Sequence, residues 1–416
     1  MRFQAPRGTQ DILPDQSHRW QRLESDFRAL AMSFGYREIR TPIFEDTELF
    51  SRTSGETSDI VSKQMYTFMD KGDRQITLKP EQTAPTIRAV IEHNLCPTGS
   101  IGRFFYITPF FRYERPQKGR FRQAHQCGLE LLGSASATAD AEIIEATVRF
   151  YESLGLNDLI VSLNSLGRDA CRAAFREAIL AHAAPFIKDA ESELHERILK
   201  NPLRLLDSKD EVTIQHMKSA PSILEFLEPE CRQRFDDLQQ LLTDASVAFE
   251  VRPEIVRGLD YYTETVFEVQ SAKLGAQSAL CGGGRYDNLV KELGGASTPS
   301  VGVGIGIERA LMVLDEEGIS WLEDVPRVFI ATTDPETTRV SLEIARKLRS
   351  SGISVLNDPD FRSLKSQLRQ ADRSGARYVV VVGSDELRRG SVVLRDMKTS
   401  DQSEVAIDQL ATKVLG

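Results

Sequence analysis

The sequence is poor in cysteine, in histidine and in long apolar runs, and each shortage argues against a class of protein. Its five cysteines and six histidines are scattered, with no Cys-x-x-Cys pair and no histidine at ligand spacing, which argues against a disulfide framework and a structural zinc site. No Ser/His/Asp order stands out. No apolar run approaches the length that spans a bilayer, and residues 1–14 lack the apolar core of a signal peptide. We therefore expect a cytoplasmic protein that does not enter the membrane.

Composition and charge fit a folded globular protein of two or three domains. The 416 residues are 41% hydrophobic and 27% charged, as in ordinary globular proteins. The net charge of −9 argues against a protein that binds nucleic acid non-specifically along its length. Residues 326–416 carry 15 Lys and Arg against 12 Asp and Glu, or +3, which leaves 37 against 49, or −12, for the rest. This asymmetry is a weak indication that the C-terminal part meets a polyanion, and a solvated basic surface is the simpler explanation.

The most informative stretch, residues 104–133, predicts two strands joined by a basic loop. Apolar and aromatic runs flank the sequence Arg-Pro-Gln-Lys-Gly-Arg, where Pro and Gly break regular structure. Two-residue alternation places Arg112 and Glu114 on one face of the first strand, and Gln126 and Glu130 on one face of the second. The predicted sheet therefore has one apolar face and one face of charged and amide groups. A structural antiparallel sheet with a wet polar face gives the same pattern.

This stretch resembles motif 2 of the class II aminoacyl-tRNA synthetases, and within that class it is similar to the histidyl-tRNA synthetase family. The order Phe-Arg-x-Glu, basic loop, Arg-x-x-x-Gln and Gly-x-Glu is long and specific. The resemblance extends over nearly the whole chain. It implies an α/β protein with an α+β catalytic core, in which helices flank the antiparallel sheet of class II synthetases, with a helical insertion and a C-terminal α/β anticodon-binding domain.

The N-terminal part resembles motif 1 of the same class. Apolar residues at helical spacing predict a helix over residues 14–34, followed after Gly35 by a short strand. By resemblance, this helix and strand form a homodimer interface, although any amphipathic helix packed on a strand has this pattern. Residues 50–65 are rich in Ser, Thr and Gly and predict a surface loop.

Glu81 and Thr83 stand at the start of a predicted helix, in the sequence Leu-Lys-Pro-Glu-Gln-Thr-Ala. A carboxylate at this place can be a capping residue that the helix dipole favours. The segment also resembles the LRPEGTA element of the family, whose Glu and Thr hold the α-amino group of the substrate. Lys79 and Gln82 replace the Arg and Gly of that element, so any contact made by the family's Arg is open here.

Two further elements fit the histidyl branch. By resemblance, Arg257 in the sequence Arg-Gly-Leu-Asp-Tyr-Tyr-Thr faces the reacting carboxylate and the α-phosphate, and Tyr261 and Tyr262 help to form an imidazole pocket. An apolar strand with two tyrosines is also typical of a protein core. The sequence Cys-Gly-Gly-Gly-Arg-Tyr-Asp at residues 281–287 predicts a glycine-rich turn into a helix and borders the amino-acid pocket in the family. Its glycines permit close approach to a ligand, or only a tight turn.

Residues 300–314 resemble motif 3, whose Arg meets ATP. Alternation places Gly302, Gly304 and Gly306 on one face of a strand, where they offer a flat shelf for a planar base or allow close sheet packing. The run is not a dinucleotide fingerprint, because an isoleucine stands where the third glycine is needed. Arg309 at the start of the following helix favours a phosphate or base contact.

The patterns predict a catalytic domain over residues 1–320 with a helical insertion at about 170–242, a linker over 321–326 and an α/β domain over 327–416. By resemblance, the insertion lies over the acceptor stem of the tRNA. The last domain resembles the anticodon-binding domain shared by histidyl, threonyl, prolyl and glycyl synthetases.

The resemblance implies ATP-dependent activation of L-histidine and transfer to the 3′ end of tRNA(His), with Mg²⁺ held by the ATP phosphates and no metal held by the protein. The implied catalytic residues at the α-phosphate are Arg112 and Arg257. Histidine would be bound by Glu81, Thr83, Arg112, Gln126, Glu130, Arg257, Tyr261 and Tyr262. ATP would be bound by Arg112, Glu114 and Arg309. The acceptor end of the tRNA would be bound by Arg115, Gln117, Lys118 and Arg120.

Two other functions compete with this interpretation. One is a synthetase-like regulatory subunit of histidine biosynthesis that charges no tRNA, and the other is a different class II synthetase with the same C-terminal domain. The intact Arg-Gly-Leu-Asp-Tyr-Tyr sequence and the C-terminal domain argue against the first. The same sequence together with Cys-Gly-Gly-Gly-Arg-Tyr-Asp argues against the second.

Overall fold

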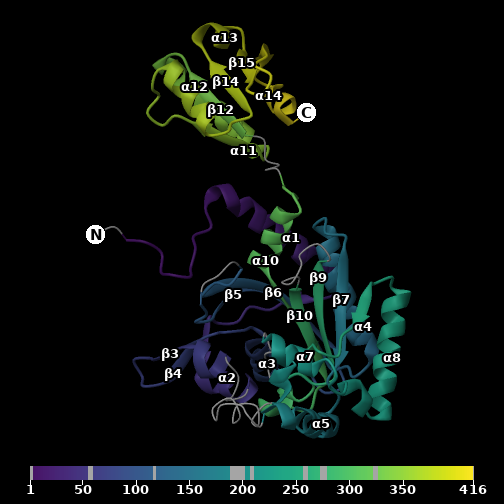
Figure 1. Ribbon diagram of the computed structural model, residues 1–416. Coiled ribbons are helices and arrows are strands. Elements are labelled where there is room, and N and C mark those ends of the chain that lie inside the picture. Colours follow the sequence, from purple (N-terminus) through teal and green to yellow (C-terminus); the bar gives the residue numbers. More distant parts are fainter. Residues whose placement is uncertain are drawn as a thin grey trace. The chain divides into compact units, whose positions relative to one another are not determined.

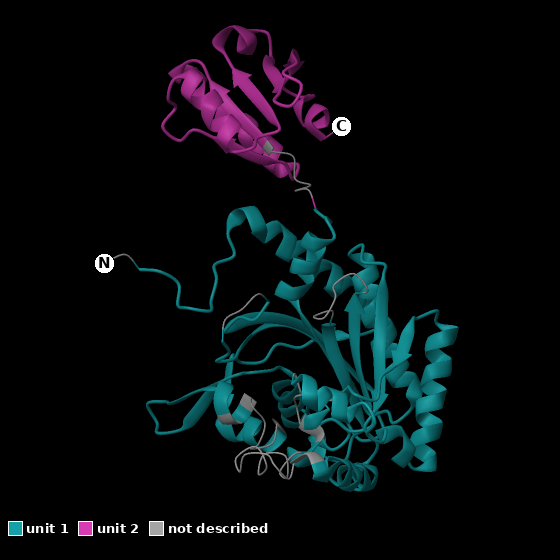
Figure 2. Cartoon of the chain, viewed as in Figure 1, with its two compact units in different colours: residues 1–320 teal, residues 321–416 magenta. Residues whose placement is uncertain are grey.

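The computed structural model describes residues 3–54, 60–115, 119–187, 202–206, 210–255, 261–271, 279–321 and 327–415. The chain divides into two compact units, residues 1–320 and 321–416, which Figure 2 shows in teal and magenta. Among the described residues, no helix has the length and apolar character needed to cross a membrane.

The first unit is built on an eight-stranded sheet, and the predicted hairpin lies within it. In sheet order the strands are β1 (Arg37–Glu38), β5 (Gly102–Phe111), β6 (Gln123–Leu132), β11 (Ser300–Gly306), β10 (Ala279–Arg285), β9 (Thr265–Ser271), β7 (Leu159–Ser165) and β8 (Phe249–Val251). The six central strands run antiparallel to their neighbours, and the short edge strands β1 and β8 pair in parallel. The predicted sheet and hairpin are confirmed.

Helices cover the apolar face of this sheet. Cys127, Leu129 and Leu131 alternate along β6 and are buried, because α1 (Pro14–Ser33), α4 (Ala137–Ser153) and α10 (Ile307–Glu316) pack against the strand. Figure 1 shows α4 beside α8 (Pro229–Asp244), and these two helices are in contact. The hydrophobic side of the predicted alternation is therefore the core of the unit.

Three local predictions are wrong. β5 ends at Phe111, so Arg112 and Glu114 lie beyond the strand and not on its face. The glycine run at residues 282–284 is no turn but the middle of β10, paired on both sides; a Cβ atom at Gly283 would stand 2.3 Å from a backbone oxygen of β11, so only glycine allows this pairing. In the predicted 50–65 loop, residues 50–54 end a helix and residues 60–64 form a π-helical turn, whereas residues 55–59 lie outside the described part of the chain.

Smaller elements complete the first unit. A three-stranded sheet has the order β2-β4-β3. The remaining elements are β2 (Phe44–Asp46), α2 (Thr47–Ser54), a π-helical turn η1 (Ile60–Gln64), β3 (Tyr66–Met69), β4 (Gln75–Leu78), α3 (Thr83–Glu92), α5 (Asp169–Ile187), η2 (Pro202–Leu205), α7 (Glu211–Met217), η3 (Ile223–Phe226) and α9 (Leu289–Glu292). Within the predicted insertion, α5, η2, α7 and η3 share a small apolar core.

The second unit is an α/β layer structure with a five-stranded sheet in the order β13-β12-β14-β15-β16. β13, β12 and β14 are parallel, and β15 and β16 continue antiparallel. Its elements are β12 (Arg327–Thr332), η5 (Pro335–Thr337), α11 (Thr338–Ser350), β13 (Ser354–Asn357), α12 (Leu364–Arg373), β14 (Tyr378–Val382), α13 (Ser384–Arg388), β15 (Ser391–Asp396), β16 (Gln402–Ala406) and α14 (Leu410–Leu415). The α/β architecture expected for the C-terminal part of the chain is confirmed.

Candidate active site

Glu130 stands at the centre of a buried polar cluster on β6. Its side chain has no exposed area, and its carboxylate accepts hydrogen bonds from Thr83 Oγ1 at 2.7 Å, from Tyr106 Oη at 3.3 Å and from the Tyr286 hydroxyl. Burial raises the pKa of Glu130 to about 8, against the lowering effect of these hydroxyl groups. The alternative interpretation, a sheet whose polar face is simply exposed to water, is therefore wrong at this position.

Glu81 lies next to this cluster and is also buried. Its two carboxylate oxygens accept hydrogen bonds from the backbone N–H groups of Thr83 at 2.6 Å and Ala84 at 2.9 Å, the first two residues of α3. Burial raises the pKa of Glu81, while the two N–H groups and the charge of Arg112 lower it. The carboxylate thus satisfies a helix start and at the same time places negative charge near Glu130, where it further raises the pKa of that group.

Aromatic rings enclose the cluster. The ring centroids of Tyr261 and Tyr262 are 4.8 Å apart, and those of Tyr261 and Tyr286 are 5.8 Å apart. All three side chains are buried. Arg257, which the resemblance places at the same pocket, lies outside the described residues.

The glycines of β11 make room for this arrangement. Gly302 pairs with Glu130, and a Cβ atom at Gly302 would stand 1.8 Å from Glu130 Oε2. That end of the predicted shelf is therefore filled by the protein's own carboxylate. At Gly304 and Gly306 the nearest atoms to an added Cβ are 3.4 Å and 3.7 Å away, so the shelf is limited to these two residues.

Charged groups gather where the β5–β6 hairpin meets α10. Arg112 Nε donates to the Pro80 carbonyl oxygen at 2.8 Å. Glu114 Oε2 is buried without a hydrogen-bond partner in the described part of the chain, and Arg120 Nη1 lies 3.6 Å from it. Gly119 adopts a φ of 75°, and a Cβ atom there would lie 4.0 Å from Arg309 Nη1. The hairpin end and the start of α10 thus carry one buried carboxylate oxygen and three guanidinium groups, those of Arg112, Arg120 and Arg309.

The remaining predicted loop residues differ in how much the structure shows of them. Arg115 and Arg120 are both exposed. Gln117 and Lys118 lie outside the described residues. Gln126 is half-buried on β6 opposite Gly306.

The two departures from the family pattern have local partners. Lys79 is completely buried, and its Nζ donates to Thr108 Oγ1 at 2.7 Å. Burial lowers the pKa of Lys79 to about 8, although Glu45 and Glu81 oppose this effect. Gln82 Nε2 donates to Thr41 Oγ1 at 2.9 Å. Both side chains therefore connect the Glu81 segment to neighbouring elements.

Sequence reasoning missed Tyr106 and Tyr286 as partners of Glu130. Tyr286 belongs to the glycine-rich segment at residues 281–287 that the sequence analysis identified. Within that segment, its neighbour Arg285 was an equally good candidate for a residue of the site. Arg285 is buried and forms an ion pair at 2.9 Å with Asp140 of α4. Burial raises the pKa of Asp140 to about 6, and Arg285 opposes the shift. The arginine therefore anchors α4, and the tyrosine reaches the site.

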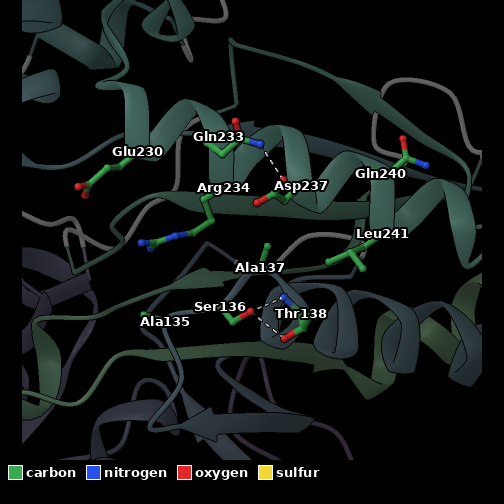
Figure 3. A pocket seen from close by; sticks show the side chains of 10 residues that line it. All are labelled: Ala135, Ser136, Ala137, Thr138, Glu230, Gln233, Arg234, Asp237, Gln240 and Leu241. Atoms are coloured by element: carbon green, nitrogen blue, oxygen red, sulfur yellow. Dashed lines mark hydrogen bonds between the residues drawn. The ribbon is translucent and has the colours of Figure 1, made fainter.

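A separate groove of about 690 Å³ lies between the start of α4 and the face of α8. Figure 3 shows its polar wall on α8, where Gln233 bonds to Asp237, and its opposite wall at Ser136 and Thr138. None of the residues predicted for the site lines this groove, so it is distinct from the Glu130 cluster.

Comparison with known proteins gives a consistent result. A family model described as histidyl-tRNA synthetase matches residues 8–310, and one described as an anticodon binding domain matches residues 327–416. The chain is 45% identical over 415 residues to the histidine–tRNA ligase of Caldicellulosiruptor saccharolyticus, with 100% of this chain and 99% of that one covered. It is 46% identical to the histidine–tRNA ligase of Thermosipho melanesiensis over 97% of this chain and 96% of that one. The apo crystal structure of histidyl-tRNA synthetase from S. aureus has a TM-score of 0.83 at 36% identity and full coverage of both chains. The chain therefore belongs to the histidyl-tRNA synthetase family.

Proposed function

We propose that this protein is a histidine–tRNA ligase, which uses ATP to activate L-histidine and transfers the amino acid to the 3′ end of tRNA(His). The observation that carries the proposal is the buried Glu130 carboxylate, held by three hydroxyl groups beside a second buried carboxylate, in a chain of this family. The regulatory-subunit alternative has less support, because relatives over the full length are named as ligases.

Histidine recognition is assigned to the Glu130 cluster. A carboxylate that already accepts from hydroxyl groups still has lone pairs for an imidazole N–H, and an apolar amino acid of similar size would not supply that further hydrogen bond. Such a mismatch gives strong discrimination. Glu81, Gln126 and Glu130 together hold the ammonium and imidazole groups, and Thr83, Tyr261 and Tyr262 complete the pocket. The two carboxylates suit a ligand that brings positive charge between them.

ATP is assigned to the hairpin end and α10. The buried Glu114 Oε2, which has no hydrogen-bond partner in the described part of the chain, is an acceptor suited to the amino group of adenine. Arg112 and Arg257 are assigned to the α-phosphate and Arg309 to the γ-phosphate end. Mg²⁺ would be held by the phosphates and would offset their charge.

The reaction has two steps. A carboxylate oxygen of histidine attacks the α-phosphorus while pyrophosphate leaves, and a terminal ribose hydroxyl then attacks the carbonyl carbon while AMP leaves. The guanidinium groups position the reactants and stabilise the charge that develops on the phosphate. Arg115, Gln117, Lys118 and Arg120 are assigned to the acceptor end of the tRNA, since arginine suits phosphate oxygens and guanine edges.

We also propose that the protein acts as a cytoplasmic homodimer. The support within this chain is a group of apolar side chains on and beside the β2-β4-β3 sheet, which are 46–57% exposed: Ile43, Phe44, Phe68 and Met69. Exposed apolar clusters of this kind mark contact surfaces. Sedimentation equilibrium that gives the mass of one chain at micromolar concentration would contradict the proposal.

Pyrophosphate exchange into ATP tests the function directly. Exchange measured with each standard amino acid in turn should occur with histidine alone and should collapse in Arg257→Ala. Charging of tRNA(His) transcripts then tests the second step. Absence of exchange with every amino acid, from folded protein, would favour the regulatory subunit.

A further inference from the structure

Two buried cysteines and a glutamate meet at the starts of two helices, outside the Glu130 cluster. Cys171 is the third residue of α5, Cys231 is the third residue of α8, and Glu228 immediately precedes α8. The ligand atoms of these three side chains all lie within 4.8 Å of one another. Both cysteines are unpaired by disulfide and are 2% and 1% exposed, and Glu228 is half-buried.

Helix starts and buried charged groups surround this cluster, and burial together with the charge of Glu264 raises the pKa of the Cys231 thiol to about 11. Both cysteines lie in the first turn of a helix, where the backbone N–H groups and the helix dipole stabilise anions. Arg168, which precedes α5, opposes the raised pKa of Cys231, but its charge is shared with Glu230 and Glu264. Glu228 occupies the N-cap position of α8 but makes no capping hydrogen bond with its side chain. Its carboxylate is therefore not used to satisfy the helix it precedes.

We propose that Cys171, Cys231 and Glu228 bind one thiolate-preferring divalent cation, with Zn²⁺ as the expected ion and water as the fourth ligand. Two sulfurs and one carboxylate oxygen form a ligand set that zinc accepts in tetrahedral geometry. Each cysteine releases its thiol proton to solvent as its sulfur binds the ion. No sequence pattern indicates this site, because the cysteines are sixty positions apart and only the fold brings the starts of α5 and α8 together.

The position of the site indicates a structural role. Arg168, before α5, pairs with Glu264 at 2.9 Å, and Arg234 of α8 pairs with the other oxygen of Glu264 at 3.0 Å. Arg172 of α5 donates to the Tyr262 carbonyl oxygen at 2.8 Å. These contacts attach the segment around Tyr262 and Glu264 to α5 and α8. An ion that joins the starts of the two helices would therefore also fix the position of this segment. This consequence rests on the proposed function, whereas metal binding itself does not.

Metal binding is tested on the full-length protein, reduced and stripped with a chelator. Zn²⁺ is titrated against a chromophoric chelator, and Co²⁺ is added separately to look for thiolate-to-cobalt charge-transfer absorption. We expect one ion per chain and an absorption intensity that corresponds to two thiolates. Cys171→Ser and Cys231→Ser should abolish that binding. Glu228→Gln should lower the Zn²⁺ affinity by about tenfold or more, since loss of even a residue that only supports a ligand has an effect of that size. Cys96→Ser, on a half-buried cysteine of the same unit, should leave it unchanged.

Three results would overturn the proposal. They are no Co²⁺–thiolate absorption in the wild-type protein, unchanged Zn²⁺ stoichiometry in both serine variants, and a Cys171–Cys231 disulfide in the protein as purified. The Co²⁺ measurement is made on the wild-type protein, so it tests for thiolate ligands even if a serine variant fails to fold. Histidine-dependent pyrophosphate exchange, measured on the same preparation, separates failure of the metal site from failure of the proposed function.

Discussion

Gly302 on β11 lies opposite Glu130 on β6, and a Cβ atom at Gly302 would stand 1.8 Å from Glu130 Oε2. The same added atom would lie 2.8 Å from the Leu129 carbonyl oxygen. Contacts below 3.0 Å require movement, and here one neighbour is backbone. The orientation of the Glu130 carboxylate therefore requires a glycine, which has no side chain, at position 302 of the adjacent strand.

Gly302→Ala should reduce histidine activation sharply. The methyl group would push Glu130 away from Tyr286 and Thr83, so we expect histidine-dependent pyrophosphate exchange to fall by about tenfold or more, equivalent to at least about 1.4 kcal/mol. Gly304→Ala on the same strand is the matched control, because its Cβ would meet only Gln126 Oε1 at 3.4 Å. Equal losses in the two variants would show that the clash with Glu130 is not what matters.

Glu130 should make the stability of the first unit depend on pH. Its pKa is raised from 4.5 to about 8 in the fold, so the folded protein keeps a proton that the unfolded chain has lost. Stability must therefore fall as pH rises from about 4.5 to about 8. In Glu130→Gln this decline should shrink by a few kcal/mol, which urea unfolding at pH 5 and pH 8 would measure.

The pH window separates this effect from that of Lys79. The pKa of Lys79 is lowered from 10.5 to about 8 by burial, so its folded form loses a proton before the unfolded form does. Its contribution therefore makes stability rise with pH, but only above about pH 8. An unchanged slope between pH 5 and pH 8 in Glu130→Gln would contradict the assignment to Glu130.

Local patterns predicted the elements, whereas the site depended on contacts that no pattern encodes. The alternation along β6 placed Gln126 and Glu130 on one face because side chains on a strand alternate. The hydroxyl of Tyr286 reaches Glu130 across 156 positions of sequence, and nothing in its own segment distinguished it from Arg285. The glycines of β10 gave a wrong prediction, because a run of glycines suits a turn and also suits a crowded strand.

Arg120→Ala should weaken tRNA charging more than adenylate formation. Arg120 is exposed on the hairpin loop but also lies 3.6 Å from Glu114 Oε2, so the variant alone could act through either contact. Arg115→Ala is the matched control, since Arg115 is another exposed arginine of the same loop. Single-turnover transfer should slow in both variants while exchange is retained. Loss of exchange in Arg120→Ala alone would assign that residue to the positioning of Glu114 instead.

Glu264→Gln should loosen the Tyr262 segment from α5 and α8. Glu264 is 3% exposed and its oxygens pair with Arg168 and Arg234, so the neutral side chain would leave two guanidinium groups close together at a cost of about 1–3 kcal/mol. We expect the KM for histidine to rise more than the KM for ATP, because Tyr262 belongs to the proposed histidine pocket. Glu230→Gln removes a carboxylate that pairs with the same Arg168 but is 78% exposed, and an exposed pair contributes at most about 1 kcal/mol. A similar change of KM in both variants would show that Arg168, and not the buried carboxylate, holds the segment in place.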